Sequence, residues 1–298
     1  MTFSVVVPVK CAPAGRGDDL ERLRLLLSSL EKFWSGTGQL PIHLICPRDD
    51  IAKIEPILQG RHPRLQVSLH DEVEVVPHLG RGTKAAGWLK QQAIKLSVHK
   101  VVAGDFALVL DADLFCTRSF DDGALFVNGR ALTDWVDRGK FPRWWSYSAE
   151  VLRLPSPGAG PGMGVTPQLF STAVCKALEE YLATIHGPDP YATLLDLDTI
   201  VADANGYNGW TEYTLYCLFA ERFGLMAKYH LSQAEVAAAG KRLGSSASVW
   251  DKDALAAWLA KPLAIDPKSF FTVVQSNTLV APEIVATHIR EGLGLTDV

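Results

Sequence analysis

Two aspartates separated by a single residue, Asp111 and Asp113, have the types and spacing that most directly suggest chemistry. They follow the apolar segment 106–110, FALVL, which is typical of a buried strand. In open α/β sheets, ligands bind beyond the carboxyl ends of such strands. Two carboxylates there can share Mg²⁺ or Mn²⁺, which often binds few protein groups and completes its shell with substrate phosphates. A metal on a diphosphate would offset the charge that develops on a leaving group.

The elements that must position these aspartates alternate along the first half of the chain. Apolar runs predict strands at 3–9, 42–46, 65–69 and 106–110, and helical spacing predicts helices at about 19–34, 49–58 and 85–99. We expect Asp18 or Asp19 to cap the first helix, and Asp49 or Asp50 to cap the second. This order predicts an α/β fold, a Rossmann-type sandwich with a mostly parallel central sheet and helices on both faces.

The second half of the chain contains more aromatic residues and more loops. It predicts strands at 143–147 and 270–275, and helices at 168–186, 210–223 and 255–259. The segment 155–164 is rich in Pro and Gly and is interpreted as a loop that could close over a bound ligand. We interpret residues 1–298 as a single domain. The half at 1–117 would bind a nucleotide donor, and the half at 118–298 would bind the acceptor of the group that the donor transfers.

The composition is that of an ordinary globular enzyme. The 298 residues are 48% hydrophobic and 21% charged, with a net charge of −4 and no basic stripe that would indicate nucleic-acid binding. No apolar run reaches the ~20 residues that span a bilayer, although a surface patch could still attach the chain to a membrane. The cysteines are dispersed without a zinc-binding spacing, which predicts reduced thiols and a cytoplasmic location. They are Cys11, Cys46, Cys116, Cys175 and Cys217.

The motifs of the first half resemble the GT-A superfamily of glycosyltransferases. The resemblance covers the opening strand VVVPV at 5–9, the alternation of strands and helices, and LVLDAD at 108–113. The segments GWLKQQAIKL at 87–96 and WTEY at 210–213 also resemble an uncharacterised bacterial subgroup.

The resemblance implies a metal-dependent transfer of a sugar from a nucleotide-sugar donor, such as a UDP- or GDP-sugar, to the hydroxyl of a saccharide or other acceptor. Such a reaction would suit the synthesis of bacterial surface polysaccharides or glycoconjugates. The resemblance further implies that Asp111 and Asp113 hold Mn²⁺ or Mg²⁺ on the donor diphosphate. The residues that follow the first strand would then line the nucleotide pocket: Pro8, Val9 and Lys10.

Further donor-binding candidates lie on the helix expected at about 85–99. Trp88, Gln92 (or the adjacent Gln91) and Lys95 share one helical face, where an aromatic ring, an amide and an amine would suit a base or sugar and a phosphate. Lys84 stands in the preceding glycine-containing loop, whose backbone N–H groups could also meet a phosphate. The alternative is that Trp88 packs in the core and the polar side chains are solvated.

The candidate catalytic base is Glu212, near the start of a predicted helix whose dipole would favour the ionised carboxylate. The alternative is a carboxylate of the helix-capping turn, although we expect no capping box between Thr211 and Thr214. Asp203 is a weaker candidate base. The GT-A resemblance also implies a third metal ligand near the C-terminus, for which His288 is the candidate and His230 the alternative. Other candidates are Gln275, Ser276 and Asn277 as ligand contacts, and Trp144, Trp145 and Trp210 as a sugar-stacking platform.

Three other functions remain compatible with these residues. A phosphatase of the haloacid dehalogenase type also has an Asp-x-Asp after a strand, but usually on an early strand and with Thr or Val close behind. A sugar nucleotidyltransferase would carry a Gly-rich loop with Arg and Lys after the first strand, which residues 9–17 faintly resemble. A non-catalytic carbohydrate-binding protein is the third alternative.

Overall fold

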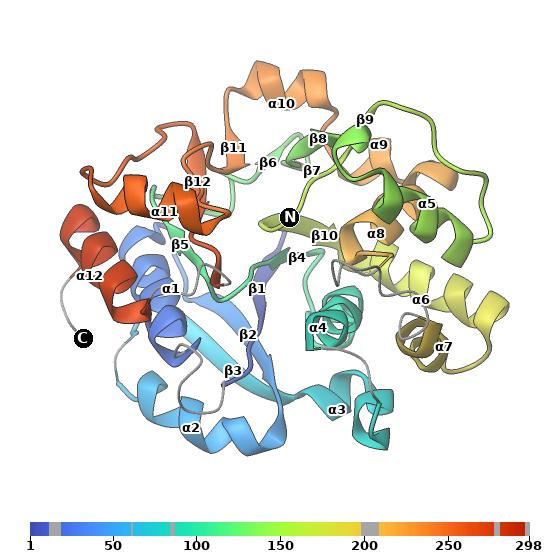
Figure 1. The fold of residues 1–298 in the computed structure, drawn as a ribbon, viewed down its shortest axis with the longest axis horizontal. Helices are drawn as coiled ribbons and strands as arrows, with labels where there is room; N and C mark the ends of the chain where they lie inside the picture. The colour runs from blue at the N-terminus through green and yellow to red at the C-terminus, as the bar shows by residue number, and fades with distance from the viewer. Residues whose placement is uncertain (12–18, 61, 84–86, 198–208, 277–280, 296–298) are drawn as a thin grey trace.

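The computed structural model describes the chain except for residues 12–18, 61, 84–86, 198–208, 277–280 and 296–298. A five-stranded sheet in the order β10-β4-β1-β2-β3 forms its centre (Figure 1). Strands β1 to β4 pair in parallel and β10 joins β4 in the antiparallel sense, so the mostly parallel sheet is confirmed. The strands are β1 (Phe3–Pro8), β2 (Leu40–Cys46), β3 (Leu65–Asp71), β4 (Phe106–Val109) and β10 (Gln168–Ser171).

Helices cover both faces of this sheet. Successive side chains of a strand point to opposite faces, so Val5 and Val7 belong to one hydrophobic core while Val6 belongs to the other. The first core contains leucines of α1 and isoleucines of α2, and the second contains apolar residues of α4, α6, α7 and α8. The helices are α1 (Asp19–Phe33), α2 (Arg48–Leu58), α4 (Gly87–Leu96), α6 (Thr172–His186), α7 (Pro190–Leu197) and α8 (Glu212–Arg222).

A smaller sheet of three strands lies beside the first, in the order β11-β12-β5. Strand β5 (Leu114–Cys116) follows the aspartate pair directly, so the pair lies where the chain passes from one sheet to the other. The strand β12 (Ser269–Val273) pairs with β5 in the antiparallel sense and with β11 (Arg242–Gly244) in parallel. Helices α11 (Lys252–Leu259) and α12 (Pro282–Leu293) contribute to a third core with Phe115.

None of the described helices is long and apolar enough to cross a membrane.

The remaining elements are short and lie mainly in the second half of the chain. The two-stranded pairs are β6 (Phe126–Val127) with β7 (Arg130–Ala131) and β8 (Trp135–Asp137) with β9 (Pro161–Met163). The other helices are α3 (Glu72–Val75), α5 (Pro142–Val151), α9 (Met226–Tyr229) and α10 (Gln233–Ala239), with 3₁₀ turns at Pro77–Arg81, Val98–Lys100 and Arg138–Lys140.

The structure corrects two predicted elements of the second half. Residues 143–147 form part of helix α5 rather than a strand, because Pro142 suits the first helical position and Trp145 and Ala149 bury one helical face. Residues 168–171 form strand β10, and the predicted helix begins only at Thr172. The four buried residues of β10 have no alternation that separates them from the helix that follows.

The expected helix caps also need correction. The N-cap of α2 is Pro47 and makes no side-chain hydrogen bond, while Asp49 and Asp50 lie in the first turn. Asp50 instead accepts a hydrogen bond from the backbone N–H of Cys11 at 2.9 Å. Helix α1 begins at Asp19, and Asp18 lies outside the described residues.

Candidate active site

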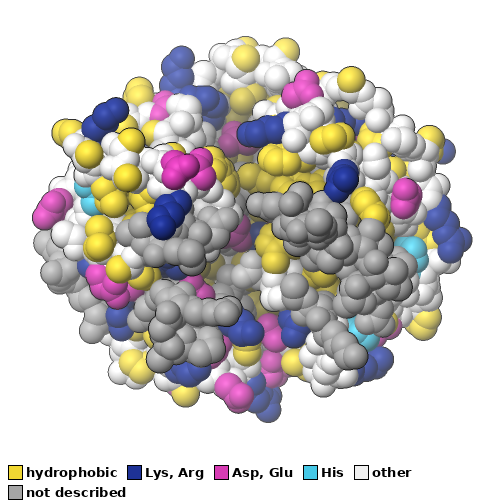
Figure 2. Space-filling model, in the orientation of Figure 1, with side chains coloured by type: hydrophobic (Ala, Val, Ile, Leu, Met, Phe, Trp, Pro, Cys, Tyr) yellow, Lys and Arg dark blue, Asp and Glu magenta, His cyan; other side chains and the backbone are white. Residues whose placement is uncertain are grey.

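A cavity of about 1970 Å³ lies beyond the carboxyl end of β4, where Asp111 forms part of its lining. Figure 2 shows the hollow near the centre of this face, with hydrophobic side chains inside it. We call the end of the cavity with Lys95 of α4 and Glu212 of α8 its floor. The rings of Trp88, Phe141 and Trp144 form its aromatic wall. The site therefore collects residues from both halves of the chain around the end of a central strand.

Lys95 stands between two carboxylates on the floor of the cavity. Its Nζ atom lies 2.6 Å from Oδ1 of Asp111 and 2.9 Å from Oε1 of Glu212, and it donates a hydrogen bond to the hydroxyl of Tyr213 at 3.3 Å. Only 3% of the Lys95 side chain and none of the Glu212 side chain is exposed. The three charged groups thus form a compact cluster, which we call the floor cluster: Lys95, Asp111 and Glu212.

The electrostatics of the floor cluster keep Lys95 charged. Burial lowers the pKa of Lys95, but Asp111 and Glu212 outweigh this effect and hold its pKa well above the usual value. Burial also raises the pKa of Glu212, and the neighbouring Lys95 opposes that rise. A buried ammonium group between two carboxylates is the arrangement that limits the cost of removing each charge from water.

Helix α8 fixes Glu212 at its first residue. Contrary to the sequence-based expectation, Thr211 and Thr214 form a capping box: Thr211 accepts from the backbone N–H of Thr214, and Thr214 accepts from that of Thr211, both at 3.1 Å. The backbone N–H of Glu212 donates to Oε1 of Gln92 at 3.2 Å, which ties α8 to α4. The carboxylate of Glu212 therefore does not cap the helix, and it forms an ion pair with Lys95 instead.

Asp113 points toward the smaller sheet and is not part of the cavity lining. Its Oδ2 atom accepts a hydrogen bond from the backbone N–H of Ser276 at 2.8 Å, and its carbonyl oxygen accepts one from Val274 at 3.0 Å. Burial, followed by the nearby charge of Asp111, raises the pKa of Asp113 to about 6. The two aspartates thus lie close enough to repel each other.

The aspartate pair fits one of the two common ways of binding a divalent metal. Among the described residues, no three His, Cys, Asp or Glu side chains lie together as a metal-binding group. An all-protein cage is thus not built from this part of the chain. Mg²⁺ and Mn²⁺ sites often need only one or two carboxylates together with substrate phosphates. Asp111 can supply one from the cavity lining, and the second would be the neighbouring Asp113, whose Oδ2 atom is bound to Ser276. Burial is the main cause of the raised pKa of Asp113, and a cation would relieve the second cause, the repulsion from Asp111.

The structure does not bring either candidate histidine to the aspartates. His288 lies in α12, where its ring packs on Trp258 with the centroids 4.5 Å apart. His230 is buried between the hydroxyls of Thr133, at 3.0 Å, and Tyr216, at 2.7 Å, and burial lowers its pKa to about 3. The expectation of a third ligand from His288 is thus not met in this arrangement, and His230 is a neutral core residue.

The other predicted donor contacts are divided between the cavity and the rest of the chain. Trp88 and Gln92 line the cavity with Lys95, as the shared helical face predicts. Pro8 and Val9 are buried at the end of β1, where the Val9 N–H donates to the carbonyl of Ile45 at 2.9 Å. These two and Lys10 are not among the lining residues. Three further candidates lie outside the described residues: Lys84, Asp203 and Asn277.

Some of the remaining candidates line the cavity and others do not. Gln275 lines the cavity, whereas the backbone of Ser276 holds Asp113. Trp144 and Trp145 line the cavity, but Trp210 is buried and donates to the carbonyl of Leu194 at 3.3 Å. In the Pro/Gly-rich segment 155–164, residues 161–163 form strand β9, so the loop itself is shorter than expected.

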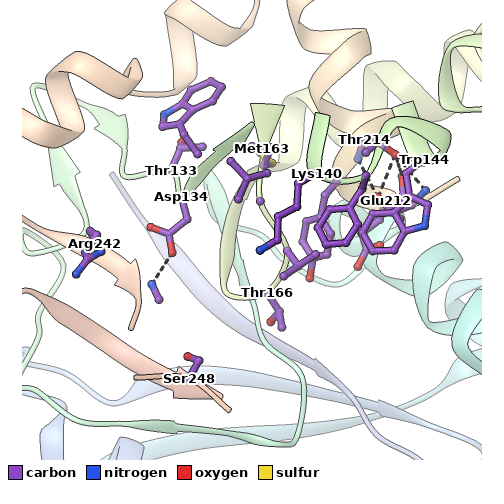
Figure 3. A pocket seen from close by; sticks show the side chains of 18 of the residues that line it. Thr133, Asp134, Lys140, Trp144, Met163, Thr166, Glu212, Thr214, Arg242 and Ser248 are labelled. Carbon is purple, nitrogen blue, oxygen red and sulfur yellow. Dashed lines mark hydrogen bonds between the residues drawn. The ribbon is translucent and has the colours of Figure 1, made fainter. Parts of the chain in front are cut away.

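Asp134 is a cavity residue that the sequence did not single out (Figure 3). Its carboxylate accepts hydrogen bonds from two backbone N–H groups of β11, from Leu243 at 3.1 Å and from Gly244 at 2.6 Å. A Cβ atom on Gly244 would lie 2.8 Å from Oδ2 of Asp134, so any larger residue there would force the carboxylate to move. Burial raises the pKa of Asp134 to about 6, against the two N–H donors and Arg242. No local sequence motif predicts the contact of Asp134 with these backbone N–H groups.

Comparison with known proteins places the chain in a family without an assigned activity. The chain belongs to the "Family of unknown function (DUF6492)", whose model matches residues 1–294. No curated protein matches it. The solved apo structure of mouse Xyloside xylosyltransferase 1 is similar, with a TM-score of 0.50 and 14% identity over 93% of this chain and 98% of that chain. At this identity the likeness shows the fold alone, a mixed α/β fold with a central, mostly parallel sheet.

Proposed function

We propose that this protein is a metal-dependent glycosyltransferase that moves a sugar from a nucleotide-sugar donor to a hydroxyl acceptor. The observation that carries the proposal is the position of Asp111, which lies on the floor of a cavity of about 1970 Å³ at the end of β4. The fold is shared with a glycosyltransferase of known structure, and ligands of such sheets bind at this edge. The cavity is large enough for a donor and an acceptor together.

In this proposal the two halves of the chain have different tasks. Residues 1–117 provide the aspartates that would hold Mn²⁺ or Mg²⁺ on the diphosphate of a UDP- or GDP-sugar. The metal would supply positive charge to the departing nucleotide diphosphate. Residues 118–298 provide most of the aromatic wall, which would receive the acceptor. Lys95 holds Oδ1 of Asp111 at 2.6 Å and so orients the carboxylate that faces the donor.

Glu212 fits a positioning role better than the role of the base. A base must come within hydrogen-bonding distance of the acceptor hydroxyl. The Glu212 side chain is fully buried and its Oε1 atom is 2.9 Å from Lys95 Nζ. We therefore propose that Glu212 holds Lys95, and that Lys95 in turn orients Asp111. A Glu212→Gln variant should then change the affinity for the donor and leave the pH profile of turnover unchanged.

The test is calorimetric titration with UDP, GDP and their sugars, each with and without Mn²⁺. We expect one nucleotide to bind in a manner that requires the metal, and Asp111→Asn and Asp113→Asn each to lower that affinity at least about tenfold, a loss of about 1.4 kcal/mol. The exposed Asp122, which lies in the next loop, provides the control variant Asp122→Asn with unchanged affinity. Equal nucleotide affinity in the wild type and both aspartate variants would refute the proposal.

A further inference from the structure

We infer that the acceptor of this reaction is an anionic glycoside, held by its charge at Lys140 and by its ring on the aromatic wall of the cavity. The inference rests on the proposed function, because it assigns the acceptor end of the same cavity. It names a class of ligand, a sugar ring that carries a phosphate or a carboxylate. The evidence comes from the wall, from the balance of charges around the cavity, and from the position of Lys140.

The aromatic wall is built by the start of α5 together with α4. The rings of Phe141 and Trp144 stack with their centroids 4.3 Å apart and their planes at 18°. Trp88 of α4 extends this surface, with its centroid 6.4 Å from that of Trp144, and it is 38% exposed. All three line the cavity. Large, partly exposed aromatic rings on a cavity wall are suited to the apolar face of a sugar ring.

The cavity carries positive charge in a protein that is negative overall. The chain has a net charge of −4, yet among the residues that the structure describes three acidic side chains line the cavity: Asp111, Asp134 and Glu212. The cationic lining residues are twice as numerous: Lys95, Lys140, Arg143, Lys241, Arg242 and Lys268. A concave surface with an excess of one charge sign concentrates ligands of the opposite sign. The cavity is therefore expected to select anionic ligands.

Part of this positive charge is neutralised by the protein and part is available. Lys95 is paired with Asp111 and Glu212, and Arg242 is paired with Asp266. Lys140, Lys241 and Lys268 have no carboxylate partner among the residues that the structure describes. These three ammonium groups can therefore bind a ligand anion without breaking an internal ion pair.

Lys140 is the lysine that links the charge to the wall. Its ammonium group lies 5.5 Å from the centroid of the Phe141 ring, and its side chain reaches into the cavity (Figure 3). The donor diphosphate has its own partners at the floor, where the aspartate pair would hold the metal. An anion at Lys140 would instead belong to a molecule that stacks on the adjoining wall, which is the acceptor.

The test uses three probes that share one ring system: 4-nitrophenyl β-glucoside, its 6-phosphate, and 4-nitrophenyl β-glucuronide. The nitrophenyl group quenches tryptophan fluorescence, so each can be titrated against the full chain, alone and with saturating nucleotide and Mn²⁺. We expect at least one anionic probe to bind at least about tenfold more tightly than the glucoside, as charge-assisted hydrogen bonds do. The preferred probe then identifies the anion as phosphate or carboxylate.

Three variants locate the effect. Lys140→Met should reduce the preference for the anionic probe to less than about threefold and leave the affinity for the neutral glucoside unchanged. Trp144→Ala should weaken all three probes. Lys261→Met, an exposed lysine outside the cavity, is the matched control and should behave as the wild type. Equal affinity for all three probes, no saturable binding of any probe, or an unchanged preference in Lys140→Met would each overturn the inference.

Nucleotide titrations separate this inference from the proposed function. Lys140→Met should bind the nucleotide and Mn²⁺ as the wild type does. If that variant loses nucleotide affinity, Lys140 serves the donor, and the inference fails while the proposed function stands. If nucleotide binding is independent of Asp111 and Asp113 but the anionic preference persists, the proposed function fails and the cavity is an anionic-glycoside site of another kind.

Discussion

Lys95 and Lys140 line the same cavity but use their charges differently. The Lys95 side chain is 3% exposed and touches carboxylates on two sides, at 2.6 and 2.9 Å. Lys140 is exposed, lies beside the Phe141 ring, and has no carboxylate partner among the described residues. The charge of Lys95 is therefore satisfied inside the protein, whereas the charge of Lys140 is available to a ligand.

This difference indicates how the two ends of the cavity are built. The floor must hold Asp111 in one orientation, and a buried ion pair does so because its partners cannot turn toward water without a large loss. In the proposed function the wall receives the acceptor. Partly exposed aromatic rings beside an ammonium group with no carboxylate partner among the described residues can do so with little internal rearrangement. The same substitution at the two lysines should thus separate a structural role from a binding role.

The largest expected effect is the loss of stability in Lys95→Met. Removing one partner of a buried ion pair leaves Asp111 and Glu212 without compensation and should lower the free energy of unfolding by about 3–5 kcal/mol. Lys140→Met should change it by no more than about 0.5 kcal/mol, as exposed substitutions usually do. Urea unfolding of both variants, followed by tryptophan fluorescence, provides the comparison. Equal losses in the two variants would contradict the distinction between floor and wall.

A smaller effect is expected from the coupling between Lys95 and Glu212. Glu212→Gln alone leaves Lys95 paired with Asp111, so we expect a loss of about 1–3 kcal/mol. In the double variant Lys95→Met/Glu212→Gln the fully buried carboxylate of Glu212 is gone and only Asp111, which is 29% exposed, remains without its cation. The loss should therefore be smaller than the sum of the single losses by about 1–3 kcal/mol. The measurement is a double-mutant cycle in urea. Additive losses would show that Glu212 and Lys95 do not act together.

The sequence predicted the first half of the fold because its signals are local. Each buried strand of the parallel sheet is a short apolar run, and each helix has apolar residues at helical spacing, such as the leucines of 20–30. In the second half, the aromatic residues of 143–147 resemble a strand, but burial against α8 makes them helical. Tertiary packing determined the conformation of this segment, and five neighbouring residues do not contain enough information to predict such packing.

The site was predictable to a similar extent. The helical spacing placed Gln92 and Lys95 on one face, and the strand placed Asp111 at the sheet edge. The meeting of Lys95 with both Asp111 and Glu212 could not be foreseen, because it depends on how α4 and α8 pack on the sheet. Asp134 was missed because its partners are backbone N–H groups of β11, 110 residues away from it at Gly244.

The smallest expected effect concerns Asp134, whose carboxylate is held by backbone N–H groups instead of a buried cation. Burial raises its pKa from 3.8 to about 6 in the folded protein. The folded protein therefore binds this proton more tightly than the unfolded chain, so the contribution of Asp134 to stability decreases as the pH rises from about 4 to about 6. The Asp134→Asn variant cannot titrate there, and its decrease should be shallower than that of the wild type by up to about 1.4 kcal/mol per pH unit.

The comparison between the two Asp134 profiles must use slopes rather than absolute values. The variant also leaves one N–H donor of β11 facing an amide N–H₂, which lowers its stability by about 1–3 kcal/mol at every pH. Asp113 titrates in the same range in both proteins, since its pKa is also raised to about 6, and its contribution cancels in the difference. Urea unfolding at pH 4, 5, 6 and 7 measures both slopes. Parallel profiles would mean that the proton on Asp134 is bound equally in the folded and unfolded chains, and would contradict the expected rise in its pKa.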